Sequence, residues 1–161
     1  MSFDALTVAP YMGRDSIEPF LTFRDKHTIL LVLTSNAGAF DYQTKMCGNK
    51  ELYKEVLAVS QHYAHSENLM YVVGATKASF LKEIRQLVPE SFLLVPGIGA
   101  QGGDLEAVCR YGMTSQVGLL VNSSRGIIYA SGGKDFAKAA AASAKEIQEL
   151  MAQELQKRIN F

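Results

Sequence analysis

Apolar residues gather along this chain in five short runs, each separated from the next by a longer polar or amphipathic stretch. The runs are mostly continuous rather than alternating, a pattern typical of parallel strands that are covered on both faces. We therefore predict buried strands at residues 4–9, 28–34, 69–73, 93–96 and 117–122.

Amphipathic stretches follow these runs and predict the helices that connect them. One helix is expected to begin at Asp15 or Ser16, and Gly112 is expected to end another in a left-handed conformation. A long polar loop separates the second run from its helix, and its length suggests that it faces a ligand. The other predicted helices cover residues 50–63, 78–88, 105–111 and 135–158.

The regular alternation of strand and helix predicts an α/β fold with a parallel sheet. Two architectures satisfy it: an open doubly wound sheet, or part of a (β/α) barrel. The loops after the last two strands decide between them, because barrels of eight strands often bind phosphate with the loops after strands seven and eight. We predict a partial TIM-type (β/α) barrel of about five βα units, with residues 1–161 as one domain.

The first of these two loops is rich in glycine. Residues 97–103 (GIGAQGG) follow an apolar run and lead to Asp104, a residue suited to cap a helix. Glycines let backbone N–H groups approach a ligand closely, and a helix N-terminus favours negative charge. The second loop contains Ser124, Arg125 and Gly126, where a guanidinium and backbone donors suit a phosphate dianion. Taken alone, a glycine-rich turn of this kind can equally well have a purely structural role and bind no ligand.

Composition excludes several other classes of protein. The 161 residues carry 16 basic and 16 acidic side chains, so nothing points to nucleic acid or a membrane surface as partner. No apolar run approaches the roughly 20 residues that span a bilayer, and no signal peptide is recognisable. Cys47 and Cys109 lack the spacing of a disulfide framework or a zinc site, which favours free thiols in the cytoplasm and no metal centre.

Five short motifs follow one another along nearly the whole chain: 7–13 (TVAPYMG), 34–36 (TSN), 73–76 (VGAT), 96–103 (PGIGAQGG) and 122–128 (NSSRGII). In this order they resemble the orotidine 5′-phosphate decarboxylase family. The resemblance implies a cofactor-free carboxy-lyase of pyrimidine biosynthesis, usually a homodimer, that converts orotidine 5′-phosphate to uridine 5′-phosphate and CO2.

The resemblance also implies a role for particular residues. Gln101 and Arg125 would hold the 5′-phosphate, with help from the backbone around Ser124 and Gly126. Ser35 would hydrogen-bond the pyrimidine, and Pro96 would line the pocket near the base. Binding energy from a remote phosphate can serve to position the reacting ring.

One departure from the family pattern concerns the chemistry itself. The family's Asp-x-Lys-x-x-Asp motif, whose lysine protonates C6, is absent from these 161 residues, so no catalytic residue is assigned. The chain corresponds to strands four to eight of the barrel. His27, His62 and His65 have no partnered nucleophile and are expected to have solvated or capping roles.

Three functions remain open at this point. The chain is either part of a decarboxylase, or a non-catalytic nucleotide or phosphate binder whose open sheet edges are covered by a second copy or a complementing chain. The third function is another sugar-phosphate decarboxylase or isomerase on a related barrel, against which Ser35 and the Gln101 loop argue.

Overall fold

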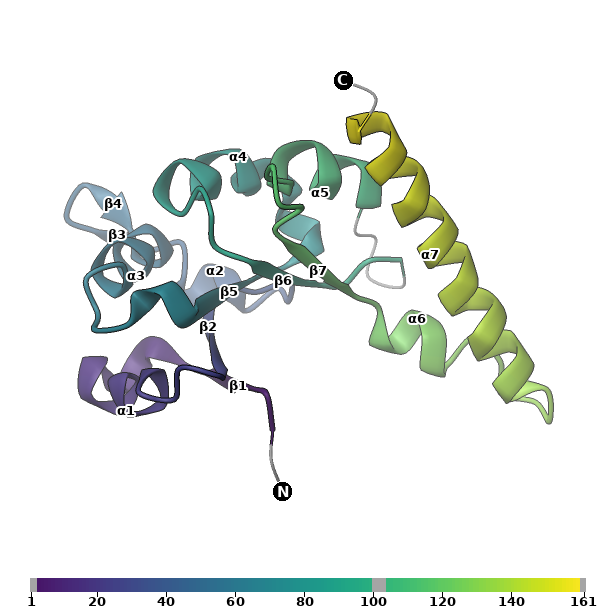
Figure 1. Ribbon diagram of the computed structural model, residues 1–161, viewed down its shortest axis with the longest axis horizontal. Helices are drawn as coiled ribbons and strands as arrows, with labels where there is room; N and C mark the ends of the chain where they lie inside the picture. Colours follow the sequence, from purple (N-terminus) through teal and green to yellow (C-terminus); the bar gives the residue numbers. More distant parts are fainter. Residues whose placement is uncertain (1–2, 100–103, 160–161) are drawn as a thin grey trace.

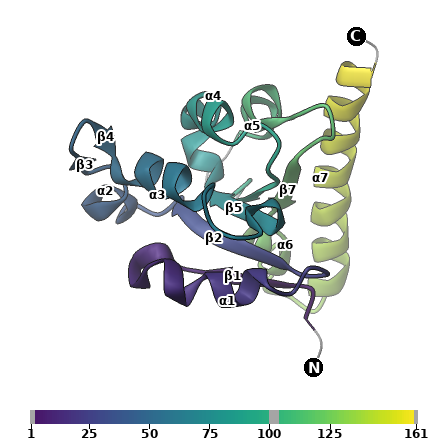
Figure 2. The same ribbon diagram turned by 60° about the vertical axis from the view of Figure 1, so that its left-hand side comes forward.

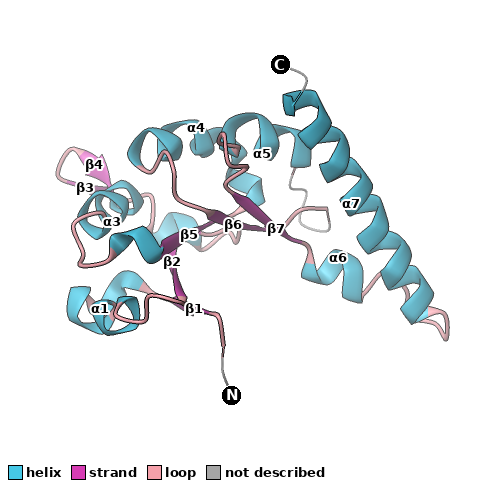
Figure 3. Cartoon of the chain, in the orientation of Figure 1, coloured by secondary structure: helices cyan, strands magenta, loops and turns pink. Residues whose placement is uncertain are grey.

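The computed structural model describes residues 3–99 and 104–159 (Figure 1). Within these residues, five parallel strands form one curved sheet, and a separate two-stranded hairpin lies in a loop (Figure 3). The five strands are β1 (Ala5–Val8), β2 (His27–Leu33), β5 (Leu69–Val73), β6 (Leu93–Pro96) and β7 (Leu119–Asn122).

The strands lie side by side in the order of the sequence, β1-β2-β5-β6-β7. A doubly wound sheet reverses its strand order at a switch point, whereas a (β/α) barrel adds each strand to the same edge. The sequential order therefore selects the partial barrel. Figures 1 and 2 show helices on the outer side of the curve: α1 (Glu18–Leu21), α3 (Leu52–Ser60), α4 (Ala78–Leu87) and α5 (Leu105–Gly112).

The hydrophobic core lies between the sheet and these helices. Leu30, Tyr71 and Leu93 occupy neighbouring register positions on β2, β5 and β6, and all three are fully buried. Leu57 of α3 and Ile84 of α4 belong to the same buried cluster. The continuous apolar runs thus form strands covered by helices, as the sequence predicts.

The predictions of buried strands at residues 4–9 and 117–122 are wrong with respect to burial, and the second of these strands begins at Leu119. β1 forms, but its Leu6 side chain is 45% exposed, and Leu120 on β7 is 50% exposed. The reason is that β1 and β7 are the two edges of the sheet among the described residues, so each has a neighbouring strand on one side alone. An apolar pattern shows which side chains favour burial. It does not show whether a neighbouring strand is present to cover them.

The long loop after β2 contains regular structure that the sequence analysis did not predict. It holds the short helix α2 (Ala39–Tyr42) and a hairpin of β3 (Met46–Cys47) and β4 (Lys50–Glu51). The helix predicted from residue 50 therefore begins at Leu52. The predicted turn at Ser124 is likewise the first turn of α6 (Ser124–Ile128), and the last helix is α7 (Phe136–Ile159).

Two predicted helix ends also differ. Asp15 and Ser16 lie in a short 3₁₀ turn (Arg14–Ser16) before α1, which starts at Glu18. Gly112 is the last residue of α5 and does not have a positive φ. Packing is tight there instead, since a Cβ would lie 3.0 Å from Leu119 Cδ2 and 3.3 Å from Leu81 Cδ1, and these side chains would have to shift to admit it. None of the helices in residues 3–99 and 104–159 is long and apolar enough to cross a bilayer.

Candidate functional site

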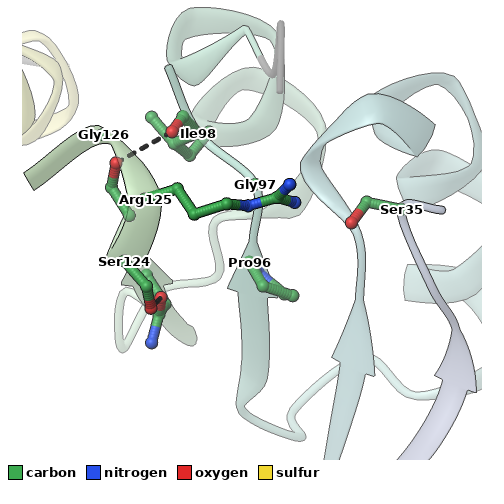
Figure 4. A pocket seen from close by; sticks show the side chains of 9 residues that line it. Ser35, Pro96, Gly97, Ile98, Ser124, Arg125 and Gly126 are labelled. Atoms are coloured by element: carbon green, nitrogen blue, oxygen red, sulfur yellow. Dashed lines mark hydrogen bonds between the residues drawn. The ribbon is translucent and has the colours of Figure 1, made fainter. Parts of the chain in front are cut away.

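A pocket of about 190 Å³ lies at the carboxyl ends of β6 and β7 (Figure 4). Parallel sheets place their ligands at this end of the strands, because the loops there converge. Three strand ends contribute to it: Pro96 ends β6, Asn122 ends β7, and Ser35 follows β2. The lining residues are Ser35, Pro96, Gly97, Ile98, Asn122, Ser123, Ser124, Arg125 and Gly126.

The loop after β6 bends sharply at two glycines. Gly97 has a φ of 98° and Gly99 a φ of 76°, a region that side chains with a Cβ rarely occupy. The Gly97 N–H donates to the Asn122 carbonyl at 3.2 Å, so the loop continues the pairing of β6 with β7. Gln101 lies outside the described residues, and its phosphate-binding role stays a prediction.

Ser123 joins the two loops of the pocket and was missed from the sequence. Its hydroxyl is buried and donates to the Ile98 carbonyl at 2.9 Å, a bond between the β6 and β7 loops. Next to it, the Ser124 hydroxyl donates to Asn122 Oδ1 at 2.8 Å. The only sequence signal was the run of polar residues 122–125, in which Ser123 was not distinguished from Ser124.

Arg125 extends from α6 across the pocket. Figure 4 shows its guanidinium passing beside Gly97 and Pro96 and pointing toward the Ser35 hydroxyl on the opposite side. Among the described lining residues it is the only charged one, so the pocket has a positive group and no carboxylate beside it. A guanidinium offers five donors in a planar fork, which matches the oxygens of phosphate.

Ser35 is held at the pocket by its neighbours from β5. The Thr76 hydroxyl donates to the Ser35 carbonyl at 3.2 Å, and the Gly74 N–H donates to the Leu33 carbonyl at 2.7 Å. The pocket thus brings together Ser35, Pro96, Ser124, Arg125 and Gly126, five of the six residues that the sequence analysis selected.

The histidines and cysteines lie away from the described lining of this pocket. Cys109 is buried in α5, and burial raises the pKa of its thiol to about 11, while Cys47 is exposed in the β3–β4 hairpin. No cluster of three His, Cys, Asp or Glu side chains able to hold a metal ion occurs in the described parts of the chain.

The model of the family described as "Orotidine 5'-phosphate decarboxylase / HUMPS family" matches residues 1–142. The chain belongs to this family. A curated relative from Christiangramia forsetii, named orotidine 5'-phosphate decarboxylase, is 65% identical over 157 residues, which are 98% of this chain and 58% of the relative.

Solved structures of family members share the fold. The structure of Leishmania donovani UMP synthase gives a TM-score of 0.77 at 38% identity and covers 90% of this chain and 32% of that one. The structure of Leishmania donovani OMP decarboxylase gives 0.75 at 35% identity, with coverage of 91% and 56%. These confirm the family resemblance and the partial (β/α) barrel. The chain spans a little over half the length of the curated relatives it matches.

Proposed function

We propose that this chain binds the phosphate and the base of orotidine 5′-phosphate, as the nucleotide-binding half of a carboxy-lyase. The observation that carries the proposal is the position of Arg125, whose guanidinium spans the pocket toward Ser35. A cation on one side and a hydroxyl on the other suit a ligand with an anionic end and a polar ring. Gln101 is proposed as the second phosphate ligand.

The phosphate end is assigned to Arg125 and the backbone of α6. The N–H groups of the first turn of a helix have no partner within the helix, so those near Ser124 and Gly126 can donate to phosphate oxygens. Binding energy gained at this remote group can position the pyrimidine beside Ser35 and Pro96.

Proton transfer to C6 requires groups that these residues do not supply. The described lining contains neither lysine nor carboxylate, and the sequence lacks Asp-x-Lys-x-x-Asp. A lysine between carboxylates serves this reaction because mutual electrostatics tune its proton transfer. The chain's own residues therefore bind and orient, and the chemistry depends on that motif being supplied to the pocket.

Isothermal titration of the 161-residue chain with uridine 5′-phosphate tests this assignment. Arg125→Ala should weaken binding by roughly 10- to 150-fold, the equivalent of about 1.5 to 3 kcal/mol for hydrogen bonds to a charged group. Arg110→Ala, on the exposed side of α5, is the matched control and should bind like the parent chain. Unchanged affinity in Arg125→Ala refutes the phosphate assignment.

A second measurement separates binding from catalysis. Release of CO2 from orotidine 5′-phosphate by the purified chain should equal the uncatalysed background. Turnover would show that the described pocket, or residues beside it, contain a proton donor that replaces the motif.

The absent motif also favours a second candidate, a non-catalytic nucleotide or phosphate binder. In either case we propose that the exposed edges at Leu6 and Leu120 pair with a second copy or a complementing chain, because bare parallel edges bind other strands readily. Light scattering after size-exclusion chromatography should give a mass above 17.6 kDa. A third candidate, a lyase or isomerase acting on a simple sugar phosphate, predicts that ribose 5-phosphate binds as tightly as uridine 5′-phosphate.

A further inference from the structure

The loop between β2 and α3 passes the pocket at Ser35 and carries a glutamine, Gln43, whose side chain folds back onto Thr34. We propose that Gln43 is a positioning residue, which fixes the Thr34–Asn36 turn and thereby sets the direction of the Ser35 hydroxyl. The inference deepens the proposed function and rests on it, since the role of Ser35 is to meet the base.

The Gln43 amide binds Thr34 in two ways. Its Oε1 accepts from the Thr34 backbone N–H at 2.8 Å, and its Nε2 donates to the Thr34 hydroxyl at 2.9 Å. The same hydroxyl donates to Asn36 Oδ1 at 2.5 Å. A primary amide supplies a donor and an acceptor together, so one side chain holds both the backbone and the hydroxyl of Thr34, and the Thr34 hydroxyl in turn holds Asn36.

The backbone of Gln43 is itself anchored to the core. Its N–H donates to the Ala39 carbonyl at 2.9 Å, and its carbonyl accepts from the Tyr53 N–H at 2.9 Å. Tyr53 is the second residue of α3, is 1% exposed and packs edge-on against Phe80 with ring centroids 5.9 Å apart. Gln43 therefore connects the first turn of α3, through its backbone, to the turn that follows β2, through its side chain.

The opposite side of the turn is limited by β5. A Cβ at Gly74 would lie 2.5 Å from the Ser35 nitrogen, so the two backbones touch and the turn cannot move toward β5. Thr76 adds its bond to the Ser35 carbonyl. With backbone close on one side, the Gln43 amide holds Thr34 on the other side of the turn.

This arrangement predicts a loss that depends on the base of the ligand. Gln43→Ala should weaken uridine 5′-phosphate binding about three- to tenfold, the range for one neutral hydrogen bond, and leave ribose 5-phosphate binding unchanged. Gln43→Glu keeps the length and the acceptor but loses the donor, so it should show the same selective loss in a chain of nearly identical shape. Gln86→Ala, on the exposed face of α4, is the control.

A double-mutant cycle tests whether Gln43 acts through Ser35. Ser35→Ala and Gln43→Ala should each weaken uridine 5′-phosphate binding, and the double variant should be no weaker than Ser35→Ala alone. Additive losses, or equal losses for the two ligands, overturn the inference.

A third readout needs no ligand. The NMR order parameter of the Ser35 amide should fall in Gln43→Ala and stay unchanged in Gln86→Ala. If the parent chain binds no nucleotide, the proposed function fails while this readout still decides the positioning role. An unchanged Ser35 order parameter refutes Gln43 as the residue that fixes the turn.

Discussion

The Nε of Arg85 donates to the carbonyl oxygen of Gly112 at 2.6 Å and so joins the ends of two adjacent helices, α4 and α5. The same guanidinium donates from Nη1 to Ser91 at 2.6 Å and from Nη2 to Gly118 at 2.8 Å. One partly buried side chain thus ties together the segments that precede β6 and β7, at the end of the sheet opposite the pocket.

Replacing Arg85 with methionine should lower the free energy of unfolding by about 3 kcal/mol, because several carbonyl groups lose a charged donor while the apolar stem is retained. Urea denaturation followed by circular dichroism measures this. Arg110→Met, exposed on α5, removes the same charge and should change stability by less than about 0.5 kcal/mol. Equal losses in the two variants would mean that net charge, and not the carbonyl contacts, sets the effect.

Tyr53 and Tyr71 form a matched pair for a test of buried hydroxyls. The Tyr53 hydroxyl is buried and has no hydrogen-bond partner among the described residues, whereas the Tyr71 hydroxyl contacts Ser60 and Gln61. Tyr53→Phe should therefore be neutral or raise stability by up to about 1 kcal/mol, and Tyr71→Phe should lower it by about 1 kcal/mol. Thermal unfolding of both variants distinguishes the two cases.

Tyr53 also predicts a dependence of stability on alkaline pH. Burial raises the pKa of its hydroxyl from 10.0 to about 12, so the folded chain keeps this proton where the unfolded chain has lost it. The contribution of Tyr53 is complete below pH 10 and is lost as the pH rises from 10 to 12. Denaturation across this range should show a smaller slope in Tyr53→Phe. An unchanged slope contradicts the assignment to Tyr53.

Gly74→Ala should damage both stability and binding. Its added Cβ would meet the backbone nitrogen and Cα of Ser35 at 2.5 and 2.6 Å, so the pocket turn must shift, at a cost of about 1 to 3 kcal/mol. Gly48→Ala is the control: it has a φ of +66° and open space within the described structure, so it should cost about 1 kcal/mol without changing nucleotide affinity. Loss of affinity in both variants would show that general destabilisation causes it.

The two thiols should react at very different rates. Cys47 is exposed, whereas Cys109 is buried with a pKa raised to about 11 by desolvation, so little thiolate forms there near neutral pH. A thiol-reactive disulfide reagent should modify one thiol per chain quickly and the second only after denaturation. Cys47→Ser should abolish the fast phase; a fast phase that persists would place Cys109 at the surface.

The five strands and their parallel arrangement were predicted from the sequence, because continuous apolar runs such as residues 28–34 are typical of parallel strands covered on both faces. The alternation of strands and helices alone left two sheet topologies open, and the phosphate-suited loops after the last two strands selected the barrel, whose sequential strand order the structure has. The exposure of Leu6 and Leu120 could not be predicted either, since burial depends on neighbouring elements and not on residue type alone. The positive φ of Val117 shortened β7 at its start, against the preference of a β-branched residue.

Most of the pocket residues were predicted from short motifs, because the loops that follow adjacent parallel strands lie side by side at one end of the sheet. Arg125 and Ser35 are separated by 90 positions in the sequence, yet the strands β2 and β7 deliver both to one pocket. Ser123 and Gln43 were missed because their contacts are with the protein itself. Nothing about a lone glutamine in a polar loop indicates that its amide returns to the residue before Ser35.

One wall of the pocket is the end of an edge strand. Asn122 closes β7, and Leu120, two residues earlier, faces outward at 50% exposure. A chain that paired with β7, as proposed above, would contact the strand that ends in this wall. By thermodynamic linkage, if such pairing tightens nucleotide binding by some factor, the nucleotide strengthens the pairing by the same factor. Ligand and partner strand are then allosteric effectors of one another.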